Sequence, residues 1–375
     1  MNKGNKDNKD KKAFSEKGNW YKGNLHCHTN KSDGILSPAE AAELYRRNGY
    51  QFLCISDHER YADYRDELNR EDFIVLPGVE SSVNLILPGE QTRETDNRNP
   101  LWERSEWLKE REGMKAVLKT HHIHGILGTG KMQEEAQSMF EGKEEDQKVY
   151  VYAGEWDGLG AAQRQIEDFK KKGCLVMYNH PLWSKVRPEE YYGLKDIWAM
   201  EIYNHSTVLD SGLGIDTRDW DALLEKGVEI YGVASDDNHN TPPIPDSCGG
   251  WVMVKAQSLT QEELVQNLQS GNFYSSSGPD IYDWGIKDGA AYIDCSPCER
   301  INFICGGPLC SGITVLKGQF GCVTEKERLE KREYMEHAEY KLNGMETYIR
   351  AECIDQYGKT AWTNAIMLDG EEKND

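Results

Sequence analysis

Histidine is the residue whose distribution in this sequence points most directly to chemistry. The chain has ten histidines, and nine of them lie between residues 26 and 239. A neutral imidazole nitrogen is a good ligand for zinc, manganese and iron. His26 and His28 stand two residues apart at the end of an expected strand, 20–28, so their side chains point to one face and can share an ion. Taken alone, such a pair is equally compatible with two half-exposed strand histidines.

Other ligand-type residues follow apolar runs that we interpret as strands. The runs cover residues 51–56, 73–79, 174–178 and 228–234. The residues just past these strands are Asp57, His58, Glu80, His180, Asp237 and His239, and Asp33 lies in an SDG turn five residues after His28. Active sites of alternating strand–helix barrels are assembled at the C-terminal ends of the strands. We therefore predict that these side chains form one metal centre.

The elements that must position these residues alternate between helix and strand. A helix is expected from Pro38 to about Gly49, because Ser37 and Glu40 form a capping box and proline favours the first helical position. Further helices are expected at 161–172, 217–226 and 260–270, the last with Thr260 as N-cap. Strand and helix at this spacing are typical of parallel βαβ units. Residues 88–120 are a charged excursion expected to hold a short helix of its own.

Composition excludes several classes of function. The net charge of −20 repels nucleic-acid backbones, so no extended basic binding surface for DNA or RNA is expected. The N-terminus has no apolar stretch of a signal peptide, and no apolar run is long enough to span a membrane. We therefore expect a cytoplasmic protein that does not bind membranes. Its ten cysteines are expected as thiols.

Taken together, the motifs resemble those of the PHP (polymerase and histidinol phosphatase) superfamily. They are HCH at 26–28, Asp33, SDH at 56–58, GVE at 78–80, a later histidine, NHP at 179–181 and SDDNH at 235–239. The resemblance implies an α/β fold, a distorted (βα)7 barrel with up to three divalent ions (Mn, Zn or Fe) at its rim. We expect a disordered tail at 1–17, a PHP metal-dependent hydrolase domain at 18–279 and a small all-β, sandwich-like domain at 280–375.

The resemblance also assigns ligands to three ions. The first ion takes His26, His28, Glu80 and Asp237, and the third takes Asp33, His58 and His239. Glu80 bridges to a second ion, which also takes His180 and a histidine of KTHHIHG. The charged excursion delays that histidine, so His121, His122 and His124 are all candidates. We choose His122, with His124 as the alternative.

The activity implied by this resemblance is hydrolysis of a phosphomonoester or phosphodiester by a metal-activated hydroxide. We expect catalytic roles for Glu80, His58, His239 and Arg60, the arginine as a contact for substrate phosphate, with Arg187 as a second such candidate. The expected substrate is a small phosphorylated molecule, a nucleotide or an oligonucleotide. Two alternatives stay open: an amide or lactone hydrolase on the same barrel, and a non-catalytic binding scaffold.

Several further residues receive supporting roles. Asp57 is expected to orient His58 or a neighbour, Asp236 to act behind the ligands or as a cap, and His205 to be structural or to contact substrate. The cysteines Cys295, Cys298, Cys305 and Cys310 are spaced loosely for a zinc site. We expect them to be small buried residues of the β domain instead.

Overall fold

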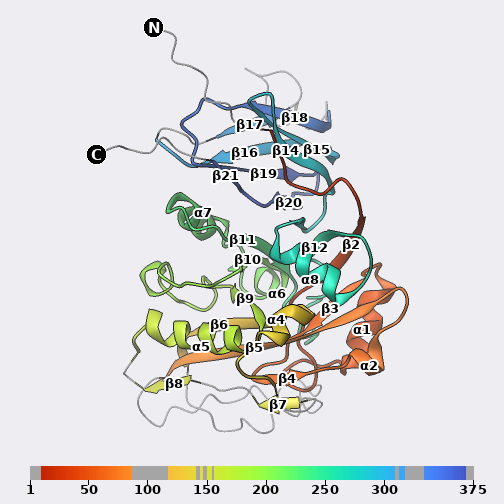
Figure 1. Ribbon diagram of the computed structural model, residues 1–375, viewed down its shortest axis with the longest axis vertical. Coiled ribbons are helices and arrows are strands. Elements are labelled where there is room, and N and C mark those ends of the chain that lie inside the picture. Colours follow the sequence, from red (N-terminus) through yellow and green to blue (C-terminus); the bar gives the residue numbers. More distant parts are fainter. Residues whose placement is uncertain are drawn as a thin grey trace.

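A single large mixed sheet organises the molecule. The computed structural model describes residues 10–86, 117–140, 144–146, 150–153, 156–308, 312–316 and 333–368. Fifteen strands belong to the large sheet, and four form a second sheet at the C-terminal end of the molecule, uppermost in Figure 1. Helices cover the lower part of the large sheet, whereas the upper part consists of strands (Figure 1).

Seven strands follow one another in the large sheet in the order of the chain. They are β2 (Asn19–Asn24), β3 (Phe52–Ile55), β5 (Ile74–Ile86), β6 (Val117–Leu127), β9 (Cys174–Asn179), β10 (Ala199–Asn204) and β11 (Tyr231–Ser235). The pairs β2–β3, β3–β5, β9–β10 and β10–β11 are parallel. Strand β6 runs antiparallel to both β5 and β9. The strictly parallel alternation expected from the sequence is therefore wrong at β6.

The expected closed (βα)7 barrel is not confirmed, because the ladder of strands does not close. Strand β2 pairs on one side with β3 and on the other with β12 (Trp251–Ala256), which runs antiparallel to it. Strand β11 is the last strand at the opposite edge of the sheet. The two ends meet only past the strands, through an isolated parallel bridge between Cys27 and Asn238. There the His28 amide donates to the Asn238 carbonyl over 3.1 Å. This bridge draws the ends of β2 and β11 together at the rim that carries the predicted ligands.

The principal helices begin and end close to where the sequence predicts. Helix α1 (Pro38–Arg47) has the predicted capping box at Ser37, and α8 (Gln261–Gln269) has Thr260 as N-cap. Helices α5 (Leu159–Lys171) and α7 (Thr217–Glu225) confirm the other two predictions. Shorter helices are α2 (Arg65–Leu68), α4 (Gly130–Glu134) and α6 (His205–Asp210), with a 3-10 turn at Pro188–Glu190. The helix expected within 88–120 lies outside the described residues. In the described part of the chain, no helix is long and apolar enough to cross a membrane.

The C-terminal part is built from strands packed as two layers. One layer is the four-stranded sheet β1 (Lys11–Lys12), β14 (Ile281–Lys287), β15 (Ala290–Cys298) and β18 (Met335–Lys341). The other is the end of the large sheet: β13 (Phe273–Ser276), β20 (Thr360–Thr363), β19 (Tyr348–Ile354), β16 (Arg300–Cys305) and β17 (Ile313–Leu316), with β21 (Ile366–Met367) beside β19. Buried residues of both layers form one core, among them Trp284, Ile293, Phe303 and Ile349. Because β13 also pairs with β12, the division into domains at residue 279 stays a prediction.

The N-terminal segment is not a free tail where the structure describes it. Strand β1 pairs antiparallel with β14, and Phe14 is buried at 3% exposure in the C-terminal core. The Phe14 ring packs edge-on against Trp20 with ring centroids 5.0 Å apart. The predicted disorder of residues 1–17 is therefore wrong for 10–17, because one aromatic residue anchors them, and residues 1–9 lie outside the described chain.

A buried arginine ties the helices to the C-terminal strands. Arg350 on β19 is 1% exposed, and its Nε and Nη2 each donate to the Asp221 carboxylate on α7 over 2.7 Å. Its Nη1 donates to Glu352 over 2.9 Å, and its guanidinium lies over the Trp220 ring. Two carboxylates therefore balance one buried cation at the junction.

Removing one of these carboxylates tests how much the junction contributes to stability. We expect Asp221→Ala to lower the free energy of unfolding by about 2–3 kcal/mol, because hydrogen bonds to a charged group are lost and Arg350 keeps only Glu352. Guanidinium unfolding would measure it. The matched control is Asp210→Ala at the exposed end of α6, where a change below about 0.5 kcal/mol is expected. An unchanged midpoint for Asp221→Ala would contradict this view of the junction.

Candidate metal centre

All nine predicted metal ligands lie together at one end of the seven strands. His26, His28 and Asp33 follow β2, His58 follows β3, Glu80 lies in β5, His122 lies in β6, His180 follows β9, and Asp237 and His239 follow β11. Four groups drawn from these nine residues have potential ligand atoms within 4.8 Å of one another, and in one of them the further residue Glu201 takes part. For the seven ligands that follow β2, β3, β9 and β11 the convergence follows from the fold, since the C-terminal ends of neighbouring parallel strands share one rim. Glu80 and His122 reach the same place from inside β5 and the antiparallel β6.

Glu80 stands at the centre of this cluster and is fully buried. Its Oε2 lies 3.2–3.3 Å from ring nitrogens of three histidines: His26, His28 and His58. Its Oε1 lies 3.1 Å from His122 Nδ1 and 3.4 Å from His180 Nε2. The two oxygens of one carboxylate thus face two different sets of histidines. This is the geometry that a carboxylate bridging two ions requires.

Asp237 completes the inner group. Its Oδ1 lies 3.1 Å from His26 Nε2 and 2.9 Å from His28 Nε2. Its Oδ2 accepts a hydrogen bond from Asn204 Nδ2 over 2.9 Å. The ligand atoms of His26, His28, Glu80 and Asp237 lie within 4.8 Å of one another. This group matches the ligand set that the PHP resemblance assigns to the first ion.

An outer group lies at the mouth of the cluster. Asp33 Oδ1 is 3.4 Å from His239 Nε2, and Asp33 Oδ2 is 3.6 Å from His58 Nε2. The Asp33 and His239 side chains are 20% and 25% exposed, whereas those of His28 and Glu80 are buried completely. A substrate would therefore reach the centre from the side of Asp33 and His239.

Several donor atoms of the cluster fit a metal better than they fit one another. Glu80 Oε2, His122 Nδ1, His180 Nε2 and Asp237 Oδ1 are buried, and although other atoms of the cluster lie 2.9–3.4 Å away, none of these contacts among the described residues has the geometry of a hydrogen bond. Leaving a buried polar atom unsatisfied costs about 1–3 kcal/mol. Four such atoms, directed at the same small region, are explained if cations satisfy them. Nitrogen and carboxylate donors of this kind suit Mn, Zn and Fe.

The electrostatics favour the ionised form of the central carboxylate. Burial opposes the charge of Glu80, yet His122 and His26 hold its pKa well below its usual range. Burial also lowers the pKa of His58 well below its usual value, despite Asp33 nearby. At neutral pH, Glu80 is therefore a carboxylate and His58 a neutral imidazole, which are the forms that bind metals.

The choice between neighbouring histidines on β6 follows from strand alternation. His122 and His124 lie on one face of the strand, and His124 is the cross-strand partner of Glu80. The ring nitrogen that approaches the Glu80 carboxylate is nevertheless that of His122, at 3.1 Å, whereas His124 Nε2 lies 3.7 Å from the Cys54 thiol. His121 points to the other face, where its ring stacks on Trp156 and hydrogen-bonds to the Tyr178 hydroxyl over 2.7 Å. The geometry agrees with His122, the residue chosen from the sequence.

Glu201 is a buried carboxylate beside the cluster that the sequence analysis missed. It lies in β10, is fully buried, and its Oε1 is 2.9 Å from His26 Nδ1. Ser235 Oγ and Asn204 Nδ2 donate to its two oxygens over 2.5 and 2.9 Å. A carboxylate on the far nitrogen fixes the ring so that Nε2 faces the metal. The sequence did contain a sign of this role: Glu201 is the charged residue inside the otherwise apolar run AMEIYN. Because a buried strand rarely carries an unpaired charge, such a residue is expected to have a partner.

The supporting residues hold loops rather than ions. Asp57 accepts hydrogen bonds from Thr29 N and Oγ1, each over 2.7 Å, and from Ser32 Oγ over 2.8 Å, so it shapes the loop that carries Asp33. The carboxylate of Asp236 accepts from Tyr45 Oη over 2.6 Å and from the amides of residues 248–250. Asp57 and Asp236 therefore stabilise the loops that carry the candidate ligands and do not face the cluster's ligand atoms themselves.

Three other predicted residues take different places. His205 opens α6, and its Nδ1 is 3.0 Å from the Tyr203 hydroxyl, which is a structural contact. Arg60 opens β4 (Arg60–Ala62), which pairs with β7 (Glu144–Asp146), two residues past His58 and half-buried. Arg187 is 75% exposed and lies 3.7 Å from Glu189 in a surface ion pair. Arg60 thus stays a candidate contact for substrate, and Arg187 loses support.

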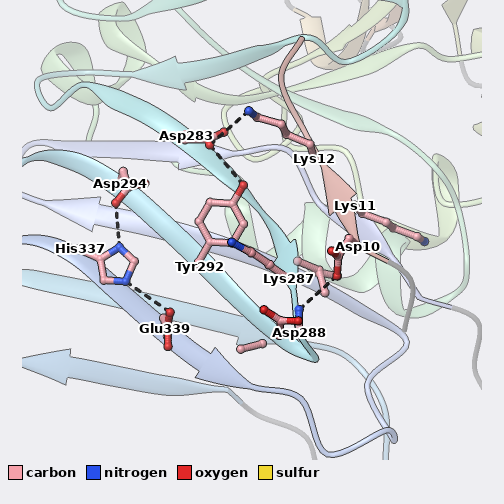
Figure 2. A pocket seen from close by; sticks show the side chains of 12 residues that line it. Asp10, Lys11, Lys12, Asp283, Lys287, Asp288, Tyr292, Asp294, His337 and Glu339 are labelled. Atoms are coloured by element: carbon pink, nitrogen blue, oxygen red, sulfur yellow. Dashed lines mark hydrogen bonds and ion pairs between the residues drawn. The ribbon is translucent and has the colours of Figure 1, made fainter. Parts of the chain in front are cut away.

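A hollow of about 800 Å³ lies elsewhere, on the four-stranded sheet (Figure 2). Its charged side chains pair among themselves: Lys12 with Asp283, and His337 with both Asp294 and Glu339. These residues are largely exposed, and mutual pairing accounts for them. We assign no reaction to this hollow.

Comparison with known proteins was made by sequence and by fold. No family model matches the chain. An alignment 79 positions long with the DNA polymerase/3'-5' exonuclease PolX of Bacillus subtilis is 37% identical and covers 16% of this chain and 14% of that protein. An alignment 255 positions long with a 5'-3' exoribonuclease of Haemophilus influenzae is 23% identical and covers 57% of this chain and 89% of that protein.

Solved structures show a loose likeness in fold. One is a two-domain protein of Bacteroides vulgatus described as containing a predicted PHP-like metal-dependent phosphoesterase, with a TM-score of 0.42 and 10% identity over 97% of this chain and 100% of that one. Another is a protein of Bifidobacterium adolescentis described as a metal-dependent phosphoesterase, with a TM-score of 0.34 and 14% identity over 66% of this chain and 94% of that one. The resemblance of the motifs to the PHP superfamily therefore stays a prediction from the sequence.

Glu201→Gln tests whether the hidden carboxylate supports the metal centre. We expect metal affinity to fall by about 10–100-fold, because the amide orients His26 less strongly and adds no negative charge. Titration calorimetry with Mn²⁺ would measure the change. Glu262→Gln on the exposed face of α8 is the matched control and should leave the affinity unchanged. Equal affinities for the two variants would rule out this role for Glu201.

The two candidate histidines of β6 can be separated by metal content. We expect His122→Ala to lose about one metal equivalent, because a donor facing Glu80 is removed. His124→Asn, two residues away on the same strand face, should retain the full content. Elemental analysis of both purified proteins measures the difference. Loss of metal in His124→Asn alone would reverse the assignment.

Proposed function

We propose that this chain is a metal-dependent phosphoesterase. The observation that carries the proposal is the nine-residue cluster around Glu80, in which four buried donor atoms have no hydrogen-bond partner among the described residues. A scaffold that only binds a partner has no use for such a costly arrangement. The cluster fits two or three divalent ions held by the ligand sets given above.

The chemistry that bound ions would supply is a hydroxide at neutral pH and a positive field for the oxygens of a phosphoryl group. The residues of the chain position that chemistry. Glu80 spans the two inner ligand sets, and Glu201 holds His26 in place. The His239 Nδ1–H donates a hydrogen bond to the Asp237 carbonyl oxygen over 2.8 Å, which turns Nε2 toward Asp33 at the mouth.

The entrance side of the centre sets the approach of substrate. We assign His58 and His239 to the side where the leaving group departs, since both border the exposed Asp33. Arg60, half-buried just past His58, is our candidate for binding the substrate phosphate, because a fixed guanidinium matches phosphate oxygens well. With a net charge of −20, the protein attracts such a substrate only where cations reverse the local field.

We further propose that the substrate is a nucleotide or a short oligonucleotide, with a phosphomonoester or phosphodiester as the bond cut. Both curated relatives carry nuclease names, and one of them is covered over 89% of its length. A long duplex is disfavoured by the charge of the chain. Amide or lactone hydrolysis stays an alternative, because a metal hydroxide also attacks carbonyl carbon.

A substrate panel with Mn²⁺ tests the proposal. It compares an aryl phosphate, a phosphodiester, a nucleoside bisphosphate, short RNA and an aryl ester. We expect turnover of at least one phosphoester, lost by about 10²-fold or more in Asp237→Asn, which removes a charge from the inner group. Turnover of the ester alone, or no turnover with metal bound, would contradict a phosphoesterase.

Arg60→Ala tests the contact with the phosphate. We expect KM for the active phosphoester to rise about tenfold, equivalent to about 1.4 kcal/mol of binding, with a smaller change in kcat. Arg187→Ala is the matched control, because that side chain is exposed in a surface ion pair, and its kinetics should match the parent protein. Unchanged kinetics in Arg60→Ala would remove this residue from the site.

A further inference from the structure

Three cysteines meet in the interior of the C-terminal sandwich, away from the nine-residue cluster. Cys295 and Cys298 come from β15 in the four-stranded sheet, and Cys353 comes from β19 in the large sheet. Their sulfur atoms lie within 4.8 Å of one another, and all three residues have zero exposure. The cluster therefore joins the two layers of the sandwich at one point.

The backbone of β15 departs from regular pairing to make this possible. In a regular strand, residues three apart point to opposite faces. Here Asp294 pairs with His337 and Cys298 pairs with Met335, so β15 advances four residues while β18 advances two. Pro297 is exposed within the irregular stretch, a position that proline tolerates at a bulge. As a result, Cys295 and Cys298 both point inward.

The third cysteine differs from the one that the sequence suggested. Cys353 lies opposite Ile301 in the pairing of β19 with β16, which places it over the irregular end of β15. Cys305 belongs to the same core, but its thiol interacts with the Tyr340 hydroxyl. Cys310 lies outside the described residues. The spacing of cysteines along the chain could not reveal a partner that arrives from β19.

The chemistry of the trio favours a cation at its centre. Thiolate sulfur is a preferred ligand of zinc, which binds it at about 2.3 Å, so two thiolates on one ion lie at most about 4.6 Å apart. Three sulfur atoms from two sheets converge here within 4.8 Å of one another, in residues with no exposure to water.

We propose that Cys295, Cys298 and Cys353 form a structural site for one thiophilic divalent cation, with zinc as the ion. Binding would displace the thiol protons of the three cysteines to solvent and form three metal–sulfur bonds, with no change in oxidation state. The fourth tetrahedral position is left to water or another ligand. Such an ion would staple the two sheets of a small sandwich, in which a metal can supply stability that a limited core does not.

The test separates this site from the nine-residue cluster by removing ligands of that cluster. Full-length protein carrying His28→Ala and Asp237→Asn is purified, treated with zinc and then desalted. We expect one zinc per chain to remain, and cobalt in place of zinc should give thiolate-to-metal charge-transfer absorption. Addition of Cys298→Ser should abolish both signals. Addition of Cys305→Ser, the buried control from the same core, should leave both intact.

Several outcomes would overturn the proposal. One is the absence of retained zinc and of a charge-transfer band in the protein with intact cysteines. This result does not depend on whether any cysteine variant folds. Equal zinc content in the Cys298→Ser and Cys305→Ser proteins would also overturn the proposal. A mass lower by two hydrogens, with two thiols lost under non-reducing conditions, would show a disulfide instead of a metal site. The phosphoesterase proposal is independent of all these results.

Discussion

The rest of the structure depends on one buried carboxylate. Glu80 has no exposure to water and faces five histidine nitrogens within 3.4 Å. An isolated carboxylate in such a place would be protonated or would destabilise the fold by several kcal/mol. It stays ionised because the surrounding rings lower its pKa. Bound cations would remove the remaining conflict, so the fold around Glu80 is best understood as a fold built to hold metal.

The bridge between the ends of β2 and β11 follows from the same constraint. His26 and His28 follow β2, and Asp237 follows β11. The bridge between Cys27 and Asn238 and the hydrogen bond from the Asp237 amide to the His26 carbonyl hold these residues together beside Glu80. A continuous ladder is not needed for that purpose. The sheet can therefore stay open and continue through β12 and β13 into the C-terminal strands, where Arg350 on β19 fastens α7. The residues of the cluster and Arg350, which links the helices to the C-terminal strands, are therefore carried by strands of the same sheet.

The sequence could single out the side chains that converge around Glu80 because most of them follow an apolar run in a recognisable motif; their role as metal ligands stays a prediction. The helices were also predictable, since caps such as Ser37 and Thr260 are local signals. Three features depended on distant contacts and could not be predicted. β6 reverses direction after the charged excursion, Phe14 pins residues 10–17 into a core formed by residues near the other end of the chain, and Glu201 reveals its role only through its contact with His26. The pairing of Cys353 with Cys295 and Cys298 is of the same kind.

The most direct measurement of the central claim is anomalous diffraction from crystals of the protein grown with Mn²⁺. The account predicts peaks on both sides of the Glu80 carboxylate: one near His26, His28 and Asp237, and one near His122 and His180. A third peak is expected near Asp33, His58 and His239. Absence of any peak within bonding distance of Glu80, at a Mn²⁺ concentration that supports catalysis, would contradict it.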